Sequence, residues 1–273
     1  MANDENKLSP PSGFAATSLL AIMQLNALLK GKRVIFLFVL LGVPLFISVV
    51  LKLQSSAPER DFSIVAPQAF LVFLLPLIGL FHGSSALSEE VDQRTLGYLL
   101  LRPIPREQIA FGKFIGAWAT TVFIIGVSIV SCHVVVGWEG SLLRLWQAEF
   151  WQPMFAFLAI MSLGAAVYVA FSLFLSLRLK RPVFVGLFYI VIVEFLFPVI
   201  PGPISNLAMT THLQRLMPER YQSMEAVVAE EARIIMAEND PWISGAVLML
   251  VFGSLATATL MRFRNYDLSY GEE

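Results

Sequence analysis

The chain has 273 residues, of which 57% are hydrophobic and only 14% charged, with a formal net charge of −1. A soluble domain carries roughly 25% charged residues, so this composition excludes a soluble globular protein and predicts an integral membrane protein. The balanced charge excludes a global attraction for nucleic acid. A single cysteine, Cys132, excludes an intramolecular disulfide.

The N-terminal region precedes the first strongly apolar segment. Residues 1–13 are polar and proline-rich, which predicts a disordered tail. Residues 14–29 are largely apolar but short for a membrane span, and they end at the basic run Lys30-Gly31-Lys32-Arg33. We favour an interfacial helix along the inner membrane surface, with basic residues at its C-terminal end. The alternative is that residues 14–29 begin a long, bent first span.

Six apolar segments follow, each near the roughly 20 residues that cross a bilayer as a helix. We place these spans at residues 34–51, 65–87, 114–136, 154–177, 182–200 and 242–261. Thirteen of the 19 lysines and arginines fall on the side that holds both termini. The positive-inside rule puts that side in the cytoplasm, so we expect a multi-pass protein of the cell inner membrane. The predicted fold class is therefore all-α integral membrane, with six transmembrane helices and an N-terminal interfacial helix in one domain, residues 14–273.

The connections on the outer side are unequal in length. Residues 54–64 are predicted as a short loop, and residues 137–153 carry tryptophans that suit the headgroup layer. Residues 202–240 form the longest connection. There Ser223 is a candidate cap for an amphipathic helix that lies against the outer surface or covers the bundle.

The polar stretch at residues 89–113, between the second and third spans, carries charges of both signs. Its acids are Glu89, Glu90, Asp92 and Glu107, and its bases are Arg94, Arg102, Arg106 and Lys113. Such a mixture suits a docking surface for a water-soluble partner. Pro103 and Pro105 end any helix begun earlier, since proline lacks a backbone donor. Pro105 can in turn start a helix that continues into the third span, which predicts two helices bent around residues 102–105.

No nucleotide-binding loop is found in the sequence. A Walker A motif needs an upstream glycine and a Ser or Thr directly after its Gly-Lys pair. Gly112-Lys113 is followed by Phe114, and Gly31-Lys32 is followed by Arg33. We therefore expect no catalytic, cofactor or metal site on this chain, and any ATP must be hydrolysed on another chain.

Glu194 is the ionisable group placed deepest within a predicted span. Intramembrane carboxylates are costly and face a bundle interior, a cavity or a partner. One interpretation is a substrate-path or proton-carrying group. The other is a hydrogen-bonded glutamate that joins helices near the outer end, through Tyr189 or a residue of the long outer loop.

Other polar or small residues in the spans favour packing over chemistry. His82, His133, His212, Cys132 and the outer-loop methionines do not follow a metal-ligand spacing, so packing is the better interpretation. The pairs Gly79/Gly83 and Gly112/Gly116 have the four-residue spacing that lets helices approach closely. Glycine is common in membrane spans, so chance explains each pair equally well.

Residues 89–113 resemble the corresponding loop of permease subunits of ABC-2-type ATP-binding-cassette transporters. The matching residues are Glu90, Thr95-Leu96, Leu99-Leu100, Arg102-Pro103, Arg106, Ile109 and Gly112-Lys113. The resemblance implies a permease that pairs with a second permease chain and two cytoplasmic ATPase subunits, which bind the ATP and magnesium. It also implies that residues 89–113 form a coupling loop seated on the ATPase. Its contact residues would be Glu89, Glu90, Arg94, Thr95, Arg102 and Arg106, with Pro103 and Pro105 setting its stiffness.

Three functions remain open at this point. The favoured one is the permease half of an ATP-driven exporter, working as a dimer. The first alternative is a proton-coupled secondary transporter that uses Glu194, and the second is a membrane scaffold subunit with no transport path. A separate alternative concerns residues 89–113 alone: their arginines satisfy the positive-inside rule and bind anionic lipid headgroups, without docking a partner.

Overall fold

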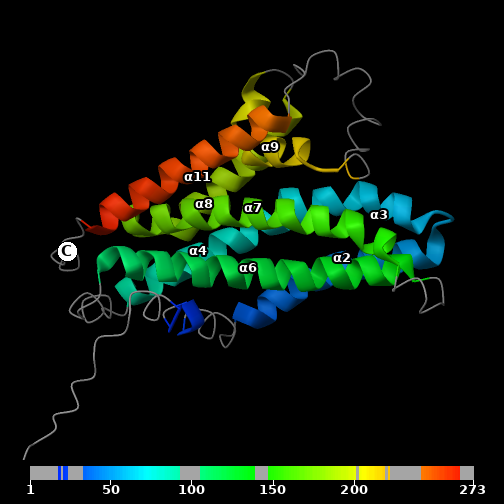
Figure 1. Cartoon of the computed structure of the whole chain (residues 1–273), viewed down its shortest axis with the longest axis horizontal. Helices are drawn as coiled ribbons and strands as arrows, with labels where there is room; N and C mark the ends of the chain where they lie inside the picture. The colour runs from blue at the N-terminus through cyan, green and yellow to red at the C-terminus, as the bar shows by residue number, and fades with distance from the viewer. Residues whose placement is uncertain are drawn as a thin grey trace, which may run out of the picture.

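The structure, a computed structural model, describes residues 18–19, 21–23, 33–92, 105–138, 147–200, 203–218, 221 and 241–264. Within these ranges the side chains at 33–40, 89–92 and 149 are not described. The regular structure of the described residues is helical, and its long helices run beside one another along the longest axis of the molecule (Figure 1). The all-helical part of the predicted fold class is confirmed.

The elements follow one another as helices of different kinds. They are α2 (Arg33–Gln54), α3 (Pro58–Ala66), the π-helix η1 (Pro67–Leu74), α4 (Leu75–Asp92), α6 (Arg106–Gly137), α7 (Ala148–Arg178), α8 (Pro182–Tyr189), the π-helix η3 (Ile190–Leu196), the 3₁₀-helices η4 (Phe197–Val199) and η5 (Pro203–Leu207), α9 (Met209–Arg215) and α11 (Pro241–Arg264).

Five helical segments of the described chain are long and apolar enough to cross a membrane. They are Pro58–Ser88, Arg106–Gly137, Phe150–Arg178, Pro182–Val199 and Pro241–Arg264. Each contains the core of one predicted span, from the second to the sixth. The first predicted span falls on α2, whose described side chains begin at Leu41. That span and the count of six stay predictions. The interfacial helix at residues 14–29 also stays a prediction, because residues 14–17, 20 and 24–29 lie outside the described chain.

Two predicted outer loops are wrong in their boundaries. The chain expected to loop at residues 54–64 is helical from Pro58, and α3 continues through η1 into α4. Proline suits the first helical position, and Glu59 and Asp61 in the first turn favour the helix dipole, so these polar residues start a helix. Helix α7 likewise begins at Ala148 and holds Pro153 in its interior, which shortens the loop predicted at residues 137–153.

The second span changes its helical form between two prolines. Pro67 and Pro76 both lie inside the continuous segment Pro58–Ser88, where each removes one backbone donor from the hydrogen-bond ladder. The π-helix η1 begins at the first of them and ends just before the second. A π-segment accommodates such a break without ending the helix.

The close approach of α4 to α7 depends on two glycines. A Cβ added at Gly79 would lie 2.8 Å from the Cβ of Tyr168, and one added at Gly83 would lie 2.6 Å from the Cβ of Ser172. The second would also lie 2.8 Å from the backbone oxygen of Val169, which cannot rotate away. The Gly79/Gly83 pair is therefore a specific helix contact, and the chance interpretation is wrong for it.

We expect Gly83→Ala to destabilise the protein by about 1–3 kcal/mol, because the added methyl group forces α4 and α7 apart. Gly253→Ala on α11 is the matched control, since nothing lies within 4 Å of a Cβ at that position. The control should be neutral or stabilising by up to about 1 kcal/mol, from helix propensity alone. Thermal unfolding of the detergent-solubilised proteins measures the change in stability for each of the two variants. Equal unfolding temperatures would show that α4 and α7 tolerate separation.

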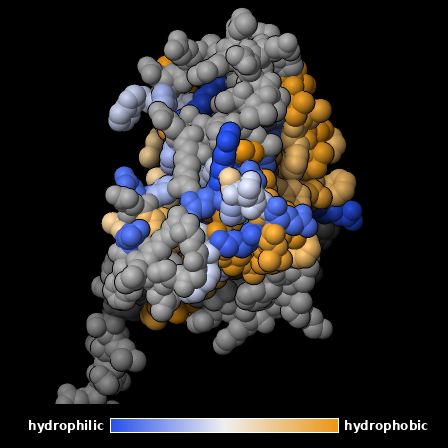
Figure 2. All heavy atoms as spheres, turned by 90° about the vertical axis from the view of Figure 1, so that its right-hand side faces the viewer, coloured by the Kyte–Doolittle hydropathy of each residue, from blue (hydrophilic) through white to orange (hydrophobic). Residues whose placement is uncertain are grey.

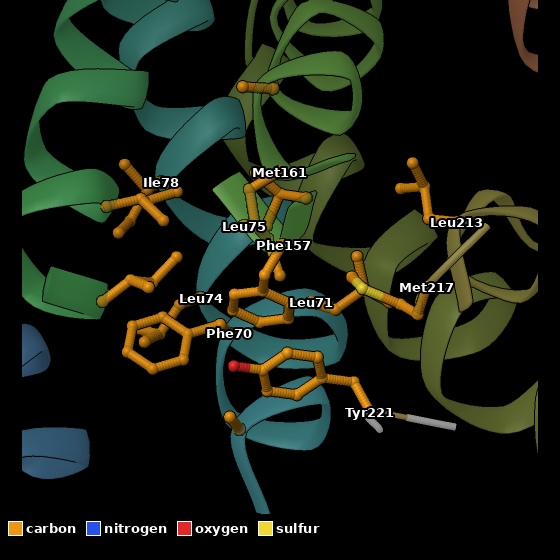
Figure 3. Packing of buried hydrophobic residues seen from close by; sticks show 14 of the residues in the cluster. Phe70, Leu71, Leu74, Leu75, Ile78, Phe157, Met161, Leu213, Met217 and Tyr221 are labelled. Carbon is orange, nitrogen blue, oxygen red and sulfur yellow. The ribbon is translucent and has the colours of Figure 1, made fainter. Parts of the chain in front are cut away.

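Two apolar clusters hold the bundle together. The larger one joins η1 and α4 to α7 and to the chain after the fifth span, as Figure 3 shows. In it Phe70 meets Phe157 edge to face at 6.3 Å between ring centroids, and Phe157 stacks on Tyr221 at 4.7 Å. The smaller cluster lies toward the end of α4, the start of α6 and the ends of α7 and α11. Its members are Ala86, Leu87, Ile109, Ala110, Ala117, Val169, Leu173, Leu177 and Phe263.

The surface is hydrophilic at the bundle end and hydrophobic along its flank. Figure 2 shows the end that carries the α2–α3 connection, with hydrophilic side chains gathered in the middle and a hydrophobic flank beside them. Helices α8 and α11 are the least buried spans, and Phe184 and Trp242 on them are 72% and 87% exposed. Such apolar faces are what a bilayer or a second membrane chain covers.

Candidate functional site

The predicted coupling loop, residues 89–113, joins the end of α4 to the start of α6. Glu89 and Glu90 lie in the last turns of α4, which ends at Asp92. Four of the predicted contact and hinge residues lie outside the described residues: Arg94, Thr95, Arg102 and Pro103. The bend around residues 102–105 and the contacts of this loop therefore stay predictions.

The far end of the loop is the rigid start of the third span. Pro105 caps α6, and its carbonyl oxygen accepts hydrogen bonds from the amides of Gln108 and Ile109 at 3.0 and 3.3 Å. From Arg106 the helix runs without a break for 32 residues, or about 48 Å at the rise of an α-helix. The helix start predicted at Pro105 is confirmed. A displacement of this end of the loop would be carried along the whole helix.

The start of α6 is also fastened to the last span. Arg106 Nη1 donates a hydrogen bond to the backbone oxygen of Arg264, the final residue of α11, at 2.9 Å. Phe263 beside it is 1% exposed and belongs to the same apolar cluster as Ile109. Further along, the rings of Phe114 and Phe252 lie 5.6 Å apart. The helix that leaves the coupling loop thus contacts α11 at several points.

Lys113 is placed differently from the expected polar loop. Its side chain is only 5% exposed, and Gly112 before it is buried as well. The polar surface at the start of α6 therefore ends before the Gly-Lys pair. This pair belongs to the packed part of the helix bundle.

A second polar centre surrounds Glu194, whose side chain is 0% exposed on the π-helix η3. Tyr189 Oη donates a hydrogen bond to Oε1 at 3.1 Å. The backbone amides of Met209 and Thr210 donate to Oε1 and Oε2 at 3.2 and 2.9 Å. The buried hydroxyl of Tyr168 on α7 lies close to the same carboxylate.

The Glu194 carboxylate accepts hydrogen bonds from backbone amides that would be costly to bury without a partner. The first amides of a helix have no partner within the helix, and Met209 and Thr210 are the first residues of α9. A carboxylate that accepts backbone N–H bonds makes charge-assisted contacts, which are stronger than neutral ones. These contacts match the second interpretation of Glu194, a hydrogen-bonded glutamate that joins helices through Tyr189 and through residues of the connection at 202–240. A proton-carrying role for Glu194 stays a prediction.

A family model described as ABC-2 family transporter protein matches residues 19–229 of the chain. This range includes the predicted coupling loop, Glu194 and α9, and it extends over most of the 273 residues. The chain belongs to the ABC-2 transporter family. No curated protein matches the chain.

Family membership identifies the chain as the membrane component of a transporter. Members of the ABC-2 transporter family supply the membrane component of a transporter and are not themselves its ATPase. The resemblance noted at residues 89–113 is thereby confirmed, and with it the prediction of a multi-pass membrane protein.

The helix α9 of this ABC-2 protein is absent from the sequence-based prediction, which placed a helix only from Ser223 onward. Residues 222–240 lie outside the described residues, so that helix stays a prediction. Leu213 lies within α9, and Met217 and Tyr221 follow its end at Arg215. All three are buried in the larger cluster, so Met217 fills an apolar core.

Helix α9 is tied to the last span by a histidine. His212 Nε2 donates a hydrogen bond to the backbone oxygen of Asn206 at 2.9 Å, and its Nδ1 lies 3.3 Å from Ser244 Oγ on α11. Arg215 Nη2 donates to Asn206 Oδ1 at 2.7 Å. The histidine therefore packs and bonds within the protein, as do His82, which pairs with Thr121 at 2.9 Å, and His133, which donates to the Phe150 oxygen at 2.8 Å.

We expect stability to fall as the pH drops below about 6.5, the ordinary histidine value. Burial, with a further contribution from Arg215, lowers the pKa of His212, although Asn206 and Glu194 act in the opposite direction. The folded state then binds the proton less readily than the unfolded state, so acid favours unfolding until the pH passes below the lowered pKa. Unfolding temperatures measured from pH 7.5 to 5 should decline more in the native chain than in His212→Gln. If the unfolding temperatures of the two proteins declined equally, His212 would not be the group that lowers stability in acid.

Proposed function

We propose that this chain is the transmembrane permease subunit of an ATP-driven exporter in the cell inner membrane. It works with a second permease chain, identical or homologous, and with cytoplasmic ATPase subunits that bind ATP and magnesium. Membership of the ABC-2 transporter family supports the proposal. The observation that carries it is the start of α6, where the coupling loop ends: it is capped by Pro105 and fastened to α11.

The mechanism follows from the stiffness of the helices at this loop. Closure of the ATPase dimer displaces the segment that contains Glu89, Glu90, Arg94, Arg102 and Arg106, and Pro103 and Pro105 keep it from yielding. The displaced loop turns α4 and α6, which enter the membrane directly from it. Because a bundle packed at the density of a protein interior shifts between discrete arrangements, a small inner displacement reorients whole spans.

The last span takes part in the same movement. The hydrogen bond from Arg106 to the Arg264 oxygen and the burial of Phe263 couple α11 to the start of α6. In contrast, most of the α11 surface is exposed to the surroundings of the bundle. A span that is fastened to the start of α6 and leaves most of its surface to lipid is suited to move with α6 when the coupling loop moves.

The exposed apolar faces support a membrane assembly. Phe184 and Phe188 on α8 are 72% and 63% exposed, and Leu250 on α11 is 73% exposed. In the proposed complex these faces meet lipid or the second permease chain. Which face meets the second chain is testable by cross-linking between cysteines introduced at these positions.

The proton-coupled alternative is less well supported by the geometry at Glu194. Both carboxylate oxygens already accept hydrogen bonds from groups of the same chain. A proton carrier must exchange its proton with a path, whereas this carboxylate fastens a span to α9. Its position in the structure favours the link between helices.

Proteoliposomes that contain the chain and its ATPase partner test the proposal. The partner's ATP hydrolysis should be raised by the native chain and should not respond to a pH gradient across the bilayer. If the chain binds no ATPase, and a pH gradient drives transport that Glu194→Gln abolishes, the proposal fails in favour of the secondary transporter.

A further inference from the structure

Residues 203–217, which we call the outer cap, fold back onto the helix bundle after the fifth span. The outer cap comprises η5 and α9, and its Leu213 and Met217 are 0% and 3% exposed. Figure 3 shows the Met217 side chain directed toward Leu71, and Leu213 belongs to the same apolar cluster. At Gly164 of α7 an added Cβ would lie 2.9 Å from a methyl carbon of Leu213. One side of the outer cap is thus an apolar wedge packed against η1 and α7.

The other sides of the outer cap are attached by polar contacts. His212 reaches Ser244 on α11 at 3.3 Å. Glu194 on the fifth span accepts the amides of Met209 and Thr210 at 3.2 and 2.9 Å. A single buried segment therefore connects the central helices to the fifth and sixth spans.

The fifth span packs on the bundle through α8, which contacts α4 and α7, but its apolar window is just 22% buried. Gly186 lies against Leu80, the rings of Tyr189 and Phe171 lie 4.5 Å apart, and those of Phe195 and Phe73 lie 6.0 Å apart. The middle of the fifth span is the π-helix η3, a form that recurs at functional sites. Glu194 is the fully buried residue of η3, and Tyr189 on the preceding turn holds its carboxylate in place.

We propose that the outer cap is a lid over the outer end of the bundle and that Glu194 is the latch that fastens it to the fifth span. A shift of the fifth span withdraws the carboxylate from the amides of Met209 and Thr210. The outer cap then keeps only its apolar wedge and the contact with Ser244, and it opens on the side of the fifth span. This inference concerns a local movement and holds whatever supplies the energy for transport.

The test uses a cysteine placed under the lid. Ala208 is 0% exposed, directly before α9, so Ala208→Cys in a Cys132→Ser background reports opening of the outer cap to a water-soluble maleimide. Native Cys132, which is 0% exposed in α6, reports loss of the whole fold in the chain without the added cysteine. The two reporters separate local release from unfolding.

With the full-length chain in detergent micelles, we expect Glu194→Gln to speed labelling at position 208 by about ten-fold or more, because the amide group cannot accept from all three donors. Tyr189→Phe keeps the backbone contacts and should give a smaller increase, of about three-fold. Thr257→Val on the exposed face of α11 is the control and should change neither reporter. Labelling at Cys132 should stay slow throughout.

Two results would overturn the latch. One is an unchanged rate at position 208 in both the Glu194 and the Tyr189 variants. The other is a parallel rise at positions 208 and 132, which would mean that Glu194 supports the fold as a whole. Tyr189→Phe decides the question if Glu194→Gln does not fold.

Discussion

Reversing the charges of Glu90 and Arg102 together, as Glu90→Arg with Arg102→Glu, is expected to remove the ATPase subunit from the purified chain. Both residues belong to the coupling loop, where charges of each sign suit a docking surface. Truncating a central residue of an interface costs about 2–4 kcal/mol, and reversal adds repulsion, so we expect a loss of roughly thirty-fold or more in bound ATPase. Co-purification from membranes, quantified by mass spectrometry, measures it.

Arg60→Glu is the matched control for this experiment. Arg60 is an exposed cation in α3, near the end of the bundle that is predicted to face outward. Its reversal should leave the amount of bound ATPase unchanged. If the double reversal also retained the ATPase in full, the loop charges would serve only topology and lipid binding, and the coupling proposal would be wrong.

Removing the ring of Phe263 is expected to lower the free energy of unfolding by about 3–5 kcal/mol, as is typical when a buried aromatic becomes alanine. The ring is 1% exposed and belongs to the cluster that joins α4, α6, α7 and α11. Its loss also weakens the attachment of α11 to the start of α6, where the Arg106 hydrogen bond and the Phe114–Phe252 contact would remain. Thermal unfolding in detergent measures the first effect, and ATPase stimulation in proteoliposomes measures the second.

Met261→Ala is the control, because Met261 lies two residues before Phe263 and is 63% exposed. Its removal takes away surface that lipid or detergent already covers. We expect a change within about 0.5 kcal/mol, as for surface positions in general. A similar loss in both variants would mean that the inner cluster does not hold α11.

The spans could be predicted from the sequence because a bilayer demands long apolar helices whatever the tertiary contacts are. The same criterion wrongly predicted a loop around Glu59 and Asp61, because these charged residues lie in the first turn of a helix. The helix start at Pro105 was predictable because proline fixes its own backbone geometry. Local rules therefore give the spans and one end of the coupling loop.

Contacts between parts of the chain that are distant in sequence could not be predicted from the sequence alone. Helix α9 has seven residues, too few to form by propensity alone, and it exists because Glu194 and the apolar core hold it. The burial of Lys113 and the fit of Gly83 against Ser172 likewise depend on which helices become neighbours. The glycine spacing indicated a possible contact, but it could not name the partner helix.

The most direct test of the account is photo-cross-linking from position 102 in intact cells. With a benzophenone amino acid in place of Arg102, we expect a product that joins this chain to a cytoplasmic protein whose peptides include a Walker A motif. A coupling loop on the cytoplasmic side is contradicted if position 102, substituted by cysteine, reacts with a membrane-impermeant reagent from outside the cell. Docking of the loop on an ATPase is contradicted if the cross-linked material contains lipid but no nucleotide-binding protein.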